Sequence, residues 1–186
     1  MKTLVAEDVV EELQTAGDEA VRWYVAACAE RMAPLFIGLR TGEAGREADV
    51  ELYRESVLDL WRTDRPMSDA AERARLLDRF PELQPAGDGS TDIVGAYTHF
   101  ACLVLRHALL ANASGSADHA VSCGHASLAA TGMLDRSTAG AVFRAEEQRL
   151  QSLSVSDNAA GVWDASVSAG RECFRAVVSR IGRQAR

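Results

Sequence analysis

Histidine and cysteine occur in this chain at spacings that could hold a metal ion. His99 and Cys102 are three residues apart, and His119 and Cys123 are four apart, so each pair would share one face of a helix. Imidazole nitrogen and thiolate sulfur are ligands that zinc prefers in proteins. These four side chains are therefore the first candidates for chemistry.

The expected helix register separates the two pairs. If the two helices form an antiparallel hairpin about a turn near residue 115, Cys123 lies level with His107 rather than with His99. At a rise of about 1.5 Å per residue, the pairs are offset by roughly 10 Å or more, too far for one zinc ion. His107 with His119 or Cys123 stays open, but so few ligands are a weak basis for a site. We favour structural histidines, and expect no metal and no cofactor.

Two adjacent carboxylates interrupt an apolar helix face. The face formed by Val142, Phe143 and Leu150 passes through Glu146 and Glu147, so at least one carboxylate should be partly buried. A buried carboxylate needs a cationic or hydrogen-bonding partner, and Arg31 and Arg106 are the candidates. Such a cluster could perform acid–base chemistry, but we favour a structural bridge between helices. The expected buried polar cluster comprises Glu30, Arg31, His99, Arg106, Glu146 and Glu147.

Familiar catalytic motifs are missing from the sequence. It holds no G-x-S-x-G, no H-E-x-x-H and no known cysteine-protease signature. Lys2 is the only lysine, which removes a Walker A loop and a Schiff-base lysine as mechanisms. We therefore expect no catalytic residue.

Helical periodicity runs through almost the whole chain, and no window alternates as a half-buried strand would. The prediction is an all-α, single-domain bundle of about seven to eight helices. A long central helix from Asp18 to about Leu39 is apolar on two sides, and Pro34 predicts a kink in it. The other helices are expected at about residues 3–15, 48–62, 68–79, 91–113, 117–132, 136–153 and 158–182.

A loop at residues 80–91 is the best linker candidate. It holds two prolines and two glycines, which are the residues that most often interrupt helices. If the single domain, residues 1–186, has a subdivision, we expect it here.

The composition is that of a soluble globular protein, with 186 residues, 47% hydrophobic and 25% charged. The net charge of −7 disfavours a nucleic-acid partner, because phosphates attract excess positive charge. Glu7 and Asp8 argue against a secretory signal, and no stretch resembles a membrane span. We expect a cytoplasmic protein without a membrane partner.

One heptapeptide resembles a known family. Cys28-Ala29-Glu30-Arg31-Met32-Ala33-Pro34 is similar to the Cys-Cys-Glu-Arg-Leu-Leu-Pro signature of the YjaG-like helical bacterial proteins, a family of unknown function. Leu58-Asp59-Leu60-Trp61, the apolar helix from Asp92, and Glu146-Glu147-Gln148-Arg149 come in the same order. The second cysteine of the signature is replaced by Ala29. The resemblance implies an all-helical bacterial protein and no catalytic residue.

The uneven charge supplies the first functional hypothesis. Residues 1–92 hold 20 acidic and 11 basic residues, and an acidic surface attracts basic partners. The hypothesis is a non-catalytic protein that binds a partner protein, for example as an immunity or adaptor protein, with its contact at Glu43, Glu47, Asp49 and Glu51. The alternative is an enzyme or small-molecule binder using His99, Arg106, Glu146 and His107 between helices. The oligomeric state is left open.

Overall fold

The computed structural model describes residues 3–62, 64–84, 92–136, 140, 142–155 and 161–184. These residues form eight α-helices and no strand, which confirms the predicted all-α, single-domain bundle. The helices are α1 (Glu7–Thr15), α2 (Asp18–Arg40), α3 (Glu47–Leu60), α4 (Ala70–Leu77), α5 (Ile93–Ser114), α6 (Ala117–Asp135), α7 (Phe143–Val155) and α8 (Val162–Gln184).

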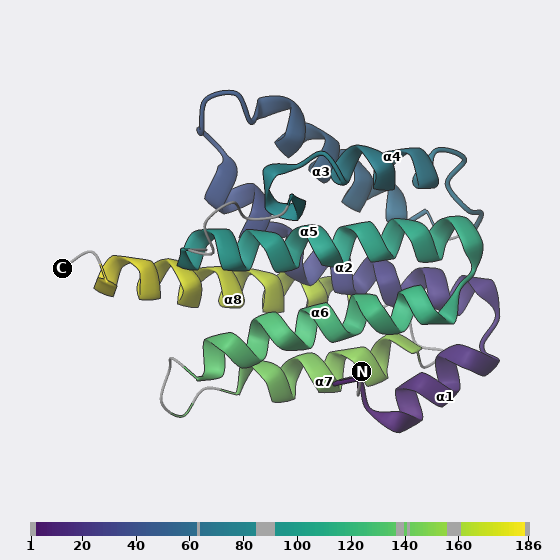
Figure 1. Ribbon diagram of the computed structural model, residues 1–186. Coiled ribbons are helices and arrows are strands. Elements are labelled where there is room, and N and C mark those ends of the chain that lie inside the picture. The colour runs from purple at the N-terminus through teal and green to yellow at the C-terminus, as the bar shows by residue number, and fades with distance from the viewer. Residues whose placement is uncertain are drawn as a thin grey trace.

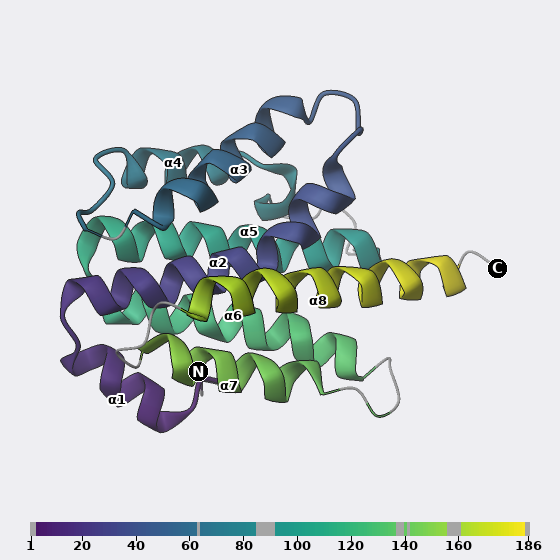
Figure 2. The same ribbon diagram turned by 180° about the vertical axis from the view of Figure 1, so that it is seen from behind.

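Helix α2 is the centre of the bundle. It packs against α3, α5, α6, α7 and α8, and it runs through the middle of both views of the molecule (Figures 1 and 2). Alanines at 26, 27, 29 and 33 are buried, and small side chains allow neighbouring helices to approach closely. Pro34 lies inside α2, and the last turns of this helix bend toward α3 in Figure 2.

Helix α5 is the most apolar element. It is long and apolar enough to cross a membrane, the only such helix among the described residues. Ten of its residues are buried, and it packs against α2, α3, α4 and α6. A core helix of a bundle passes the same length and composition test, so this feature is weak evidence for a membrane span.

The boundary between α6 and α7 differs from the prediction. Helix α6 extends to Asp135 instead of ending near residue 132, and α7 begins at Phe143 instead of residue 136. The Asp135 carboxylate accepts hydrogen bonds from the backbone N–H groups of Phe143 and Arg144 at 2.9 and 3.0 Å. The end of one helix therefore satisfies the free N–H groups at the start of the next.

The predicted linker begins as part of the core. Phe80 is buried and stacks on Phe36, and Pro81–Leu83 forms a short 3₁₀ helix. Residues 85–91 of the predicted linker lie outside the described residues. One hydrophobic core contains side chains from both sides of this segment.

Candidate functional site

A buried ion pair joins the central helix to α7. The Arg31 side chain is 1% exposed and that of Glu147 is 3% exposed. Nε of Arg31 donates to Oε2 of Glu147 at 2.7 Å, and Nη2 donates to Oε1 at 2.9 Å. Burial opposes the charge on Arg31, but the Glu147 carboxylate raises its pKa above the ordinary value. Of the two arginines predicted to meet a buried glutamate, Arg31 is the one that does so.

Further hydrogen bonds complete this pair. Arg31 also donates to Oγ of Ser166 on α8 and to Sγ of Cys28, both at 3.2 Å. Gln151 donates from Nε2 to Oε1 of Glu147 at 2.9 Å and accepts at Oε1 from the Tyr24 hydroxyl at 3.1 Å. Because each polar group is satisfied inside the bundle, Glu147 is held as a bonded carboxylate rather than as a free base.

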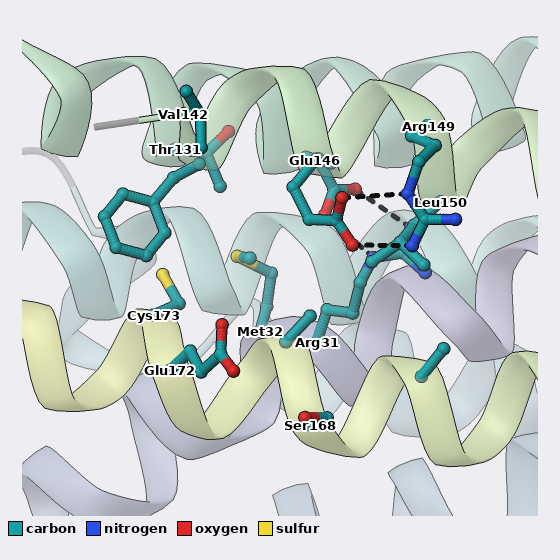
Figure 3. Close-up of a pocket in the computed structure, with 14 residues that line it drawn as sticks. Arg31, Met32, Thr131, Val142, Glu146, Arg149, Leu150, Ser168, Glu172 and Cys173 are labelled. Carbon is teal, nitrogen blue, oxygen red and sulfur yellow. Dashed lines mark hydrogen bonds and ion pairs between the residues drawn. The ribbon is translucent and has the colours of Figure 1, made fainter. Parts of the chain in front are cut away.

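A cavity of about 580 Å³ lies beside the ion pair, between α2, α6, α7 and α8 (Figure 3). Its apolar lining consists of Met32, Val142, Phe143, Leu150, Ala165, Ala169 and Cys173, and its polar lining consists of Arg31, Thr131, Glu146, Glu147, Arg149, Ser168 and Glu172. This volume and this mixture of an apolar wall with a few polar groups are typical of small-molecule sites.

The charges of this cavity are partly paired. Arg149 donates to both carboxylate oxygens of Glu146, at 2.8 and 2.6 Å, and Figure 3 shows these contacts. The bonds from Arg149 lower the pKa of Glu146, so this carboxylate is ionised at neutral pH. Glu172, from α8, makes no ion pair with any described residue.

The cysteine among the described residues that line the cavity is not a ready nucleophile. Cys173 lines the wall, and burial raises the pKa of its thiol to about 12. A thiol with that pKa is almost entirely protonated at neutral pH and reacts slowly. Glu146 and Glu147 are both held by arginines, so neither is placed as a general acid.

The predicted polar cluster is divided between separate places, which corrects the sequence prediction. Glu30 accepts from Nε1 of Trp61, and Nδ1 of His99 donates to the Glu82 carbonyl. Arg106 pairs with Asp78. Only Arg31, Glu146 and Glu147 of the predicted cluster line the cavity. Periodicity places residues on helix faces, but it does not define which faces meet.

The four predicted acidic contact residues lie at the start of α3 and the loop before it. Three have arginine partners: Glu43 pairs with Arg40, Asp49 with Arg46 and Glu51 with Arg54. Glu47 is exposed. These pairs reduce the negative field that the sequence predicted for this surface.

A second buried carboxylate was missed by the sequence analysis. The Glu82 side chain is 2% exposed; it accepts from Nη1 and Nη2 of Arg46 at 3.0 and 2.7 Å and from Nε of Arg40 at 2.7 Å. Burial raises the pKa of Glu82, but bonds from the arginines outweigh it and hold the pKa below its ordinary value. The flanking prolines and glycines marked this segment as a loop, and no periodic signal could reveal its partners.

The histidine and cysteine pairs also fall into separate places. Cys102 is buried, and Sγ of Cys123 donates to the Val104 carbonyl at 3.5 Å. His107 and His119 approach each other, with 3.4 Å between their Nδ1 atoms. Within the described ranges, no group of three or more His, Cys, Asp or Glu side chains could hold a metal ion.

No family model, curated protein or solved structure matches this chain. The resemblance of the segment from Cys28 to Pro34 to the YjaG-like proteins therefore stays a prediction. Its arginine does have a definite structural role, because Arg31 is the residue that pairs with Glu147.

Proposed function

We propose that the protein is a non-catalytic binder of a small amphipathic molecule, held in the cavity between α2, α6, α7 and α8. The observation that carries this proposal is the cavity itself, about 580 Å³ and lined by both apolar and charged side chains. The states of the lining groups favour binding over catalysis, because both carboxylates of α7 are held by arginines and the Cys173 thiol is protonated. His99, Arg106 and His107 have no part in this site.

The charge of the lining favours a positively charged ligand. Arg31 compensates Glu147 and Arg149 compensates Glu146, so Glu172 leaves the cavity with one negative charge. An ammonium group near Glu172 and an apolar body against Met32 and Phe143 would satisfy both parts of the lining. An anionic ligand of the same shape would gain no such contact.

A matched pair of probes tests the ligand class. Phenylpropylamine and phenylpropionate have similar shapes and opposite charges, and their binding can be compared by isothermal titration calorimetry. We expect the amine to bind at least tenfold more tightly, and Glu172→Gln to remove most of this preference. Equal binding of the two probes would contradict the charge assignment.

Filling the cavity tests its location. Ala169 lines the cavity, whereas Ala145 is exposed on α7 and does not line it. Ala169→Leu should weaken amine binding at least tenfold, while Ala145→Leu should leave it unchanged. Absence of amine binding to the wild-type protein, or unchanged binding to Ala169→Leu, would reject the proposal.

A protein partner on α3 is the second candidate function. Glu47, Glu51 and Glu55 are exposed at intervals of four residues, and Leu58, 62% exposed, continues the same face. A basic partner protein that also offers an apolar side chain to Leu58 would fit this face. The test is a salt-sensitive complex captured from a lysate of the source organism. The double variant Glu47→Arg with Glu55→Arg should abolish this complex. A complex that survives the double charge reversal would contradict the α3 assignment.

A further inference from the structure

Two histidines meet where the α5–α6 hairpin closes. His107 lies in the second half of α5 and His119 in the first turn of α6, and the two helices are joined through Gly115, which has a left-handed backbone with φ of 67°. Both imidazoles are partly buried, with ring centroids 5.5 Å apart and ring planes inclined by 36°. The tight turn and the packing of the two helices therefore hold the rings at a defined separation.

The two rings make a long hydrogen-bond contact, and the same separation suits two ligands of one metal ion. The two Nδ1 atoms are 3.4 Å apart, above the usual range of about 2.7–3.2 Å for hydrogen bonds donated by N–H groups. Two nitrogens bound tetrahedrally to one metal at about 2.0–2.1 Å lie about 3.3–3.4 Å from each other. The observed distance thus matches the spacing of two ligands around one ion.

We propose that His107 and His119 form a two-histidine site for a divalent transition metal of the zinc and copper class, with Nδ1 of each ring as ligand. Imidazole is a preferred ligand of these ions.

The remaining coordination positions belong to water or to an external ligand. Among the described residues no third His, Cys, Asp or Glu completes the site. Cys123, predicted as an alternative ligand, is buried and directed to the Val104 carbonyl, and burial raises its pKa. The site is therefore exchangeable, unlike a closed structural zinc site with four protein ligands.

Metal titration of the purified full chain tests the site. Zn²⁺ binding is measured by isothermal titration calorimetry for the wild-type protein, His107→Phe and His119→Ala, with far-ultraviolet circular dichroism to verify folding. We expect one equivalent of Zn²⁺ on the wild-type protein and at least tenfold weaker binding to either variant. His119→Ala is the safer variant for folding, because His119 lies in the first turn of α6 and not in the interior of a helix as His107 does.

His125→Ala is the control, since His125 accepts a hydrogen bond from the Leu4 N–H and is not part of the pair. It should bind Zn²⁺ like the wild-type protein. Cu²⁺ gives a second readout, because its electron paramagnetic resonance spectrum should show coupling to nitrogen that His119→Ala reduces. Absence of stoichiometric Zn²⁺ binding, or equal binding by His119→Ala and wild type, would overturn the proposal.

Discussion

Gly170 on α8 lies directly against the backbone of Arg31 on α2. A Cβ atom at position 170 would lie 2.9 Å from the Arg31 carbonyl oxygen and 3.2 Å from its Cα atom. Backbone atoms in the middle of a buried helix cannot move aside as a side chain can. This contact therefore sets how closely α8 approaches the helix that carries the buried ion pair.

Gly170→Ala should destabilise the fold, although alanine is the better helix former. The added methyl group forces α8 away from α2, at a cost of about 1–3 kcal/mol. Gly182→Ala is the control in the same helix, because nothing lies within 4 Å of a Cβ there; it should be neutral or stabilising by up to about 1 kcal/mol. Urea unfolding measures both, and a stable Gly170→Ala variant would contradict the close contact.

Breaking the Arg31–Glu147 pair should cost more than replacing it. Arg31→Ala leaves a buried carboxylate without its partner, so we expect a loss of roughly 2–4 kcal/mol in the free energy of unfolding. Arg31→Met combined with Glu147→Leu removes both charges and should lose less than the sum of the single variants. Glu146→Gln, in the half-exposed pair with Arg149, should change stability by at most about 1 kcal/mol. A melt unaffected by Arg31→Ala would contradict the burial of this side chain.

Glu82 should make stability depend on pH in the acid range. Its pKa in the folded state is lowered. The contribution of Glu82 to the free energy of unfolding is therefore complete above the unfolded-state pKa of about 4.3, and it is lost as pH falls through the lower folded-state pKa. Glu82→Gln should therefore destabilise the protein by about 2–4 kcal/mol at pH 7, and the difference from wild type should shrink toward pH 3. Guanidinium unfolding between pH 7 and pH 3 measures this difference, with Glu51→Gln as the surface control. A difference that does not change with pH would exclude Glu82 as its source.

The cysteines should be inert in the folded protein. Cys28, Cys102, Cys123 and Cys173 are free and buried, and burial raises the pKa of the Cys102, Cys123 and Cys173 thiols. Reaction with an aromatic disulfide reagent at pH 8 should be slow in buffer, and all four should react at once in guanidinium. Rapid labelling of any one thiol in the native protein would show that its helix opens locally.

Several features could be predicted from local pattern. Apolar residues on two sides of the segment from Asp18 to Leu39 indicate a central helix, and α2 occupies that position. The apolar face through Glu146 and Glu147 indicates a buried carboxylate, and Glu147 is buried against Arg31. Periodicity does not decide which of the two glutamates is buried, because adjacent residues differ by only about 100° around a helix.

The amino-acid sequence by itself determined the helical class and the central helix. It also determined that a buried carboxylate requires an arginine partner. These follow from residue periodicity and from the cost of burying charge, which act within single segments. Only the tertiary structure decided that Glu82 meets Arg40 and Arg46, that His99 and Arg106 lie apart from Arg31, and that α7 and α8 line a cavity together with α2 and α6. Such contacts depend on how helices far apart in the chain cross each other, and close approaches such as Gly170 against Arg31 leave no periodic signal in the residues that make them.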